Sequence, residues 1–323
     1  MLYRCLKLIV TPAMRIFCRN IIVNNKAFLK KRGPLLLACN HPSSFLDAII
    51  LDILFEQPVW SLARGDAFKN KWISSLLRRL KMFPVYRVSE GVENLNNNYE
   101  TFENCKNIFR KEGIVLIFSE GKCINEWHLR PLKKGTARLA ISSWEENIPL
   151  QVLPVGINYS SFRLFGKNVF INFGEVITQE DIDINAADGT RYQLFNNRLQ
   201  AGLSSLVFEI EKSDKTKKRR FLERKPPAFI KFLLAVPALL GWITHLPIYV
   251  PIQKITYKKT IDNDHYDSVM AAVLLVAYPI YLLCVAALLF YFTGSYLSFF
   301  SFLLMPLMAW SYVQVKPQLD SHV

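Results

Sequence analysis

The chain has 323 residues, 51% of them hydrophobic, and a formal net charge of +14, which predicts an anionic partner: nucleic acid or an anionic membrane surface. No zinc-finger, helix-turn-helix or RNA-binding signature accompanies the charge, so we expect no nucleic-acid partner. The six cysteines are scattered without a CxxC pair, which argues against a disulfide framework.

Residues 1–23 mix apolar and basic side chains, which predicts an amphipathic helix in a first region that extends to residue 30. Such a helix lies either in a membrane interface or on the surface of its own domain, and the pattern leaves both open. Pro12 is expected to bend it in either case. We expect no cleavable signal peptide, because the apolar run is interrupted and no small-residue cleavage site follows.

Residues 31–212 alternate short apolar runs with helical patterns, which predicts one α/β domain with helices flanking a mixed, mostly parallel sheet. Continuous apolar runs are typical of strands that are buried on both faces. The runs comprise residues 35–39, 59–63, 114–118 and 152–157. The helical patterns cover residues 48–55, 71–80, 95–110, 135–144 and, at the end of the domain, 180–212.

A basic stretch at residues 213–227 ends in two prolines and marks a boundary; it is either a juxtamembrane anchor for anionic lipids or a solvated linker. Residues 228–318 are expected to be membrane-associated. Their apolar segments are residues 232–252, 269–292 and 298–315. Lysines flank the first segment on both sides, and cytoplasmic loops concentrate Lys and Arg. We therefore expect a re-entrant first segment, a transmembrane hairpin of the other two, and a catalytic domain on the cytoplasmic face.

The strongest local chemical signal is the stretch Asn40-His41-Pro42-Ser43-Ser44-Phe45-Leu46-Asp47. His41 follows a predicted buried strand, where α/β proteins place catalytic groups, and Pro42 disfavours a helix there. If His41 folds back from this loop, it can act as a general base that Asp47 orients. Alternatively, Asp47 completes a capping box with Ser44, and His41 is a turn residue. The stretch by itself leaves both interpretations open.

The Asn-His pair, followed after a short spacer by Asp, resembles the first signature block of the glycerolipid acyltransferase superfamily (PlsC-like). This superfamily includes lysophosphatidate and glycerol-3-phosphate acyltransferases. Three further blocks resemble those of the family and follow in its order. They are residues 83–87 (Phe-Pro-Val-Tyr-Arg), 117–121 (Ile-Phe-Ser-Glu-Gly) and 152–156 (Val-Leu-Pro-Val-Gly). The resemblance covers about residues 35–160 and implies a PlsC-like α/β fold and acyl transfer.

The resemblance also implies roles for individual residues. His41 and Asp47 would be the catalytic pair. Arg87 would bind the phosphate of the acceptor, a role that suits the arginine fork. Glu120 and Gly121 would shape the acceptor site and hold its hydroxyls.

Two departures from the family pattern concern the acceptor. Five residues separate His41 from Asp47, where the commonest pattern has four, and Lys122-Cys123 replaces the usual Thr-Arg after Glu-Gly. Lys122 is expected to bind the substrate as a point charge in place of that arginine. A basic loop follows, which binds phosphate or faces solvent; it contains Arg130, Lys133 and Lys134.

These observations predict a membrane-bound O-acyltransferase of phospholipid biosynthesis. It would move a fatty acyl group from acyl-CoA or acyl carrier protein to a hydroxyl of lysophosphatidate or glycerol-3-phosphate. His41 would deprotonate that hydroxyl, and no covalent acyl-enzyme, metal or other cofactor is expected. A lyso-aminolipid, such as a glycine or ornithine lipid, is the alternative acceptor. An inactive membrane scaffold is the alternative without activity, and the intact signature residues argue against it.

Overall fold

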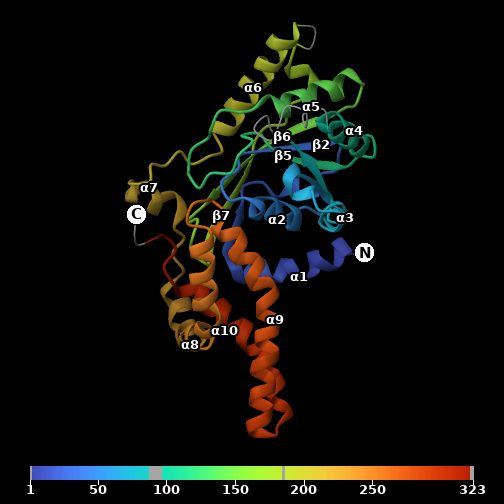
Figure 1. Ribbon diagram of the computed structural model, residues 1–323. Helices are drawn as coiled ribbons and strands as arrows, with labels where there is room; N and C mark the ends of the chain where they lie inside the picture. Colours follow the sequence, from blue (N-terminus) through green and yellow to red (C-terminus); the bar gives the residue numbers. More distant parts are fainter. Residues whose placement is uncertain (1, 87–96, 184–185, 321–323) are drawn as a thin grey trace.

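The computed structural model describes residues 2–86, 97–183 and 186–320 (Figure 1). A seven-stranded sheet lies at its centre, in the order β1-β7-β6-β2-β5-β3-β4. The strands are β1 (Cys18–Val23), β2 (Leu35–Cys39), β3 (Val59–Arg64), β4 (Met82–Val85), β5 (Ile114–Phe118), β6 (Gln151–Tyr159) and β7 (Lys167–Phe173). Among these strands only β6 and β7 pair antiparallel, which confirms the predicted mixed, mostly parallel sheet.

The central strands are buried on both faces because two separate cores cover the sheet. On β2, Leu35 and Leu37 belong to one core and Leu36 and Ala38 to the other, as the alternation of side chains along a strand requires. The first core includes α1 (Leu2–Phe17) and α2 (Phe45–Leu54). The second includes α4 (Asn97–Phe109), α5 (Lys134–Glu145) and α6 (Asp188–Ser204). Burial on both faces explains the continuous apolar runs in the sequence.

The helix predicted over residues 1–23 is too long. It ends at Phe17, and residues 18–23 form the edge strand β1, parallel to β7. The β-branched residues Ile21, Ile22 and Val23 favour a strand, but its pairing partner lies about 150 residues away and was invisible in the local pattern. Strands β4 and β7 were also missed, because one contains a proline and the other is interrupted by polar residues.

The basic stretch after the sheet domain is not simply a linker. It contains α7 (Lys215–Leu222), whose first turn is capped by the Asp214 side chain, 2.8 Å from the N–H of Lys217. Lys218 of this helix is buried, and its Nζ lies 4.5 Å from the ring centroid of Trp127. At least this cation therefore packs against the domain.

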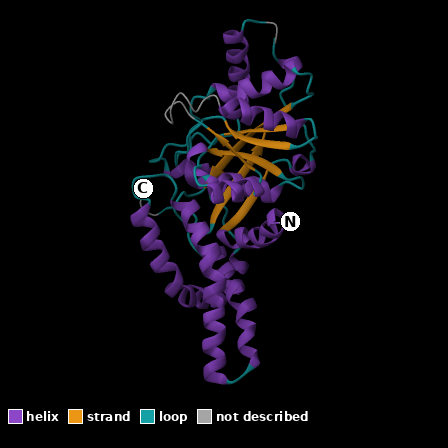
Figure 2. Cartoon of the chain, turned by 45° about the vertical axis from the view of Figure 1, so that its right-hand side comes forward, coloured by secondary structure: helices purple, strands orange, loops and turns teal. Residues whose placement is uncertain are grey.

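The C-terminal part contains α8 (Ala228–Lys259), α9 (Tyr266–Thr293), the 3-10 helix η6 (Tyr296–Phe300) and α10 (Ser301–Val315). Residues 228–259, 266–293 and 296–315 are long and apolar enough to cross a membrane. Gly294 caps α9 with φ 62°, in the left-handed region, and the chain turns there toward α10. Figure 2 shows this helical hairpin projecting away from the strands.

Both flanks of α8 lie at the same strand. Before α8, the Leu222 carbonyl accepts a 2.9 Å hydrogen bond from the side chain of Asn168 in β7. After it, Asp267 forms a buried ion pair with Lys167, the first residue of β7. The helix contains prolines at positions 237, 247 and 251. Because proline bends helices, these residues are consistent with a chain that contacts β7 both before and after α8.

Candidate active site

The candidate site lies where the carboxyl ends of the parallel strands meet. The loop with His41 follows β2, the turn with Glu120 and Gly121 follows β5, and β6 ends at Tyr159. Since these three strands are neighbours in the sheet, residues from distant parts of the sequence converge there. Open α/β sheets bind their ligands at this edge.

His41 and Asp47 contact each other across the start of α2. Nδ1 of His41 lies 2.9 Å from Oδ2 of Asp47. The Asp47 side chain is fully buried, whereas that of His41 remains 14% exposed. The alternative of a capping box is wrong, because the Ser44 side chain makes no cap hydrogen bond and the Asp47 carboxylate accepts the N–H of Ser43 instead, at 2.9 Å. The loop folds back as a catalytic pair requires.

Asp47 has a third donor that the sequence analysis missed. The hydroxyl of Tyr159 donates to Oδ1 of Asp47 at 2.6 Å, and Tyr159 is fully buried. Burial, and next the negative charge of Asp47, raise the pKa of Tyr159 well above its usual value of 10, so the phenol keeps its proton. An ionised carboxylate only accepts, so Nδ1–H of His41 donates to it and Nε2 is left as the basic nitrogen.

Two further contacts fix the His41 ring and backbone. The imidazole stacks on Phe118, with ring centroids 3.8 Å apart and planes 9° from parallel. The backbone N–H of His41 donates to Oε2 of Glu120 at 2.8 Å. Phe118 and Glu120 both come from the end of β5. The end of β5 and the turn after it therefore hold the His41 ring and backbone in place, in addition to Asp47.

Glu120 is only 3% exposed, and protein groups occupy its carboxylate. Besides the N–H of His41, it accepts the backbone N–H of Arg130 at 2.9 Å and the Arg130 guanidinium at 2.8 Å. Arg130 also lies 3.3 Å from Glu126. Arg130 is thus neither a free phosphate ligand nor a solvated cation; it ties the basic loop to Glu120. Contact between Glu120 and the acceptor hydroxyls stays a prediction.

The cations near this edge differ in their availability. Gly121 has φ 69°, and a Cβ there would lie 3.1 Å from Cγ of Lys133, so the lysine packs over the turn. Lys122, Lys133 and Lys134 are exposed. Arg87 lies outside the described residues, two positions after β4 ends at Val85.

Two thiols lie close to the catalytic pair, and both are protonated. Cys39 ends β2, and Cys123 accepts the N–H of Ser44 at 2.9 Å. Burial, and next the negative charge of Asp47, raise the pKa of both thiols above the usual value of 9. A buried thiol is a poor nucleophile, which leaves His41 as the reactive group of this loop.

The first turn of α9 also touches the catalytic loop, which the sequence analysis did not anticipate. The buried hydroxyl of Ser268 donates to the carbonyl of Ser43 at 3.1 Å and accepts the N–H of Leu46 at 3.2 Å. The side chain of Asn125 bridges the carbonyls of Pro42 and Asp264, at 2.7 and 3.3 Å. The C-terminal helices are therefore part of the structure that holds the loop.

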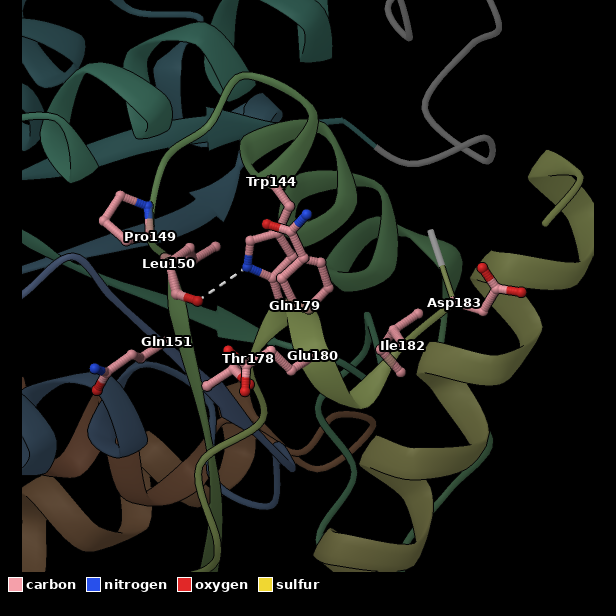
Figure 3. A pocket seen from close by; sticks show the side chains of 9 residues that line it. All are labelled: Trp144, Pro149, Leu150, Gln151, Thr178, Gln179, Glu180, Ile182 and Asp183. Atoms are coloured by element: carbon pink, nitrogen blue, oxygen red, sulfur yellow. Dashed lines mark hydrogen bonds between the residues drawn. The ribbon is translucent and has the colours of Figure 1, made fainter. Parts of the chain in front are cut away.

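A cavity of about 650 Å³ lies at the other end of the sheet (Figure 3). Trp144, Gln151 and Glu180 are among the residues that line it. Gln151 is the first residue of β6 and Tyr159 the last, a separation of about 26 Å along a strand. This cavity is therefore separate from the His41 site.

The part of the chain that carries the site is similar to known proteins. Residues 20–158, which include the catalytic pair, match the family described as Acyltransferase. The chain is 32% identical over 120 residues to the 1-acyl-sn-glycerol-3-phosphate acyltransferase of Bacillus subtilis (strain 168), covering 36% of this chain and 55% of the relative. It thus spans about half the length of that curated relative. A solved structure, the 1-acyl-sn-glycerophosphate (LPA) acyltransferase PlsC from Thermotoga maritima, shares 17% identity at a TM-score of 0.45, over 62% of this chain and 77% of that one.

Proposed function

We propose, on the premise that this chain belongs to the glycerolipid acyltransferase superfamily through residues 20–158, that it transfers a fatty acyl group from a thioester to a hydroxyl of lysophosphatidate or glycerol-3-phosphate. The observation that carries the proposal is the contact between His41 and the buried Asp47, 2.9 Å apart at the carboxyl edge of the sheet. An imidazole whose protonated form is stabilised by a neighbouring carboxylate is the base that such a transfer needs.

The reaction follows from the geometry of the pair. Nε2 of His41 takes the proton of the acceptor hydroxyl as its oxygen attacks the thioester carbonyl. Asp47 stabilises the imidazolium that forms. When the tetrahedral intermediate collapses, the C–S bond breaks and the imidazolium returns its proton to the leaving thiolate. Because Cys39 and Cys123 are held as thiols, the acyl group passes directly to the acceptor.

The charges around the site support anionic substrates. Lys122, Lys133 and Lys134 are exposed at the β5 turn, and family resemblance adds Arg87. Acceptor phosphate and the phosphates of acyl-CoA or an acyl carrier protein are all negative, so cations at this edge favour their approach. No metal or other cofactor is needed for the proposed steps.

The outward face of α1 supports attachment to a membrane. Lys7 of this helix donates to the carbonyls of Asp52 and Phe55 at the end of α2, at 2.6 and 2.7 Å. The opposite face carries Leu8, 76% exposed, and Ile9, 56% exposed. Met14 and Phe17 also pack α1 into the core, while Leu8 and Ile9 stay outside, and such a helix is suited to a lipid interface.

The C-terminal helices support the same placement. From Val273 onward most apolar side chains of α9 are exposed or half-buried, with Leu282 and Ala286 as buried exceptions, and from Val273 to Thr293 the helix is about 30 Å long, the thickness of a hydrocarbon core. Since both flanks of α8 return to β7, we propose that α8 is re-entrant and that the catalytic domain faces the cytoplasm, where the flanking lysines are favoured.

The test is acyl transfer by the full chain purified in detergent. Labelled acyl-CoA and acyl carrier protein are each offered with glycerol-3-phosphate, lysophosphatidate and lyso-aminolipids, for wild type and His41→Ala. Turnover of a glycerol-phosphate acceptor that is lost in a folded His41→Ala variant supports the proposal. Turnover of only a lyso-aminolipid would correct the acceptor, and equal turnover by both proteins would overturn the role of His41.

A further inference from the structure

Helix α3 (Lys71–Arg79) is amphipathic, yet its apolar face is not covered by the domain. Trp72 is 87% exposed, and Ile73 and Leu76 are about half exposed. None of the residues of α3 is buried. The apolar stripe of a surface helix normally faces the core, as it does in α5, where Leu139 and Trp144 are buried. An exposed apolar stripe of this kind indicates a partner outside the domain.

The charges around this apolar stripe all have one sign. Residues 67–81 contain no Asp or Glu. Their basic residues are Lys69, Lys71, Arg78, Arg79 and Lys81. The first four are exposed. Exposed tryptophan and leucine flanked by Lys and Arg, without an acidic residue in the same stretch, are typical of helices that lie in the interface of anionic membranes.

The chain just after α3 contacts the first turn of α1, a helix that exposes apolar side chains of its own. Nζ of Lys81, just after α3, lies 5.5 Å from the ring centroid of Tyr3 in α1. Figure 1 shows the two helices on the same flank of the domain, and α9 extends away on the side of α1. The 3-10 helix η2 (Gly65–Phe68) connects α3 to the carboxyl end of β3, the edge of the sheet that carries His41.

We propose that α3 is a second membrane-docking helix, which inserts Trp72, Ile73 and Leu76 into the interface of an anionic bilayer while its lysines and arginines contact lipid phosphates. Together with α1, it holds the carboxyl edge of the sheet close to the bilayer, where an amphiphilic acceptor is dissolved. The inference extends the proposed membrane attachment, but it does not depend on the proposed chemistry.

The experiment uses the full chain in vesicles and needs no turnover. Ile73→Cys and Ser75→Cys, each with Cys5→Ser and Cys284→Ser to remove the exposed thiols, receive an environment-sensitive fluorophore. Ser75 is the matched control, because two residues apart on a helix are turned about 160° from each other. Quenching by brominated lipid and by aqueous iodide is measured in phosphatidylcholine vesicles with and without phosphatidylglycerol. Leu76→Cys is a second probe of the apolar face.

We expect brominated lipid to quench the label at 73 or 76 at least about twofold more than the label at 75, and iodide to show the reverse order. The lipid quenching should fall about twofold without phosphatidylglycerol, or when Lys71→Glu and Arg79→Glu are added. Equal iodide quenching of all labels would overturn the proposal. Protection of position 73 only when acyl carrier protein is added, or only at high protein density, would assign this face to a protein instead.

Discussion

The hydroxyl of Tyr159, at the end of β6, donates to the same Asp47 carboxylate that holds Nδ1 of His41. Tyr159, Asp47 and His41 therefore form a hydrogen-bonded triad, in which Tyr159 and Asp47 are 112 positions apart in the sequence. Tyr159 does not touch the reacting atoms in this arrangement. It is a positioning residue, because it keeps the carboxylate turned toward the imidazole.

Removal of this donor should slow turnover without unfolding the chain. Tyr159→Phe keeps the ring in the core but leaves one oxygen of a buried carboxylate without its donor, a loss of about 1–3 kcal/mol. We expect kcat to fall about tenfold with KM for both substrates nearly unchanged. Steady-state acyl-transfer kinetics measure kcat and KM separately. Tyr99→Phe is the control, because Tyr99 is 75% exposed. A larger change in KM than in kcat would contradict the positioning role.

Asp47→Asn should reduce turnover strongly, although it barely changes the size of the side chain. The amide adds donors at a position where Ser43, Tyr159 and His41 already donate, so the imidazole loses its acceptor. We expect kcat to fall by about 10³- to 10⁴-fold, as when the carboxylate of a catalytic triad is replaced. Asp214→Asn is the control, because asparagine caps a helix as well as aspartate does. Activity within a few-fold of wild type in Asp47→Asn would show that His41 does not need the charge.

The buried thiols provide a test of direct transfer. Cys123→Ser keeps an acceptor for the N–H of Ser44, so we expect activity within about threefold of wild type. Because burial raises the pKa of the Cys123 thiol, iodoacetamide at neutral pH should modify the exposed Cys5 and leave Cys123 unmodified. Acyl-transfer assays measure the activity of Cys123→Ser, and mass spectrometry of the intact protein and of its peptides measures which thiols are modified. Inactive Cys123→Ser together with an acyl group trapped on wild-type Cys123 would favour a covalent intermediate.

The sequence predicted the part of the site whose residues lie within short stretches of the chain. The Asn40–Asp47 stretch and the β5 turn showed their chemistry through residue type and order, and the continuous apolar runs located four of the seven strands. Tyr159 and Ser268 could not be found in this way. Each reaches the loop only because of how the sheet and α9 pack, and neither belongs to a local sequence motif.

The same limit applies to Glu120 and Arg130. Family resemblance implies that Glu120 contacts the acceptor, which stays a prediction, and the sequence did not show that its carboxylate also holds two loops together. A residue's neighbours in three dimensions, and not its motif, decide whether its charge is available. The missed strands β1 and β7 have a comparable origin, since each is stabilised by a partner distant in sequence.

Glu120→Gln separates the structural role of this residue from a role in substrate binding. The change leaves the Arg130 guanidinium, only 18% exposed, without its buried counter-ion. We expect the free energy of unfolding to fall by about 3 kcal/mol, and activity to fall with it. Thermal unfolding in detergent measures the first effect, and Glu126→Gln is the milder control because it removes the more exposed carboxylate. Unchanged stability with a raised KM for the acceptor would instead support the contact that the family resemblance implies.

Ser268→Ala tests whether the C-terminal helices position the catalytic loop. The Ser268 hydroxyl satisfies both the carbonyl of Ser43 and the N–H of Leu46, and alanine leaves both buried groups unpaired. We expect kcat to fall about tenfold while KM for the acceptor is maintained, because the loss loosens the loop between His41 and Asp47 and not the substrate contacts. Ser268→Thr keeps the hydroxyl and should restore most of the activity. Ser311→Ala is the control, because its hydroxyl bonds only within α10, at 2.8 Å. If Ser268→Ala and Ser311→Ala have the same kcat, the first turn of α9 only anchors the domain. If Ser268→Ala alone is slow and threonine rescues it, the C-terminal hairpin takes part in holding the catalytic pair.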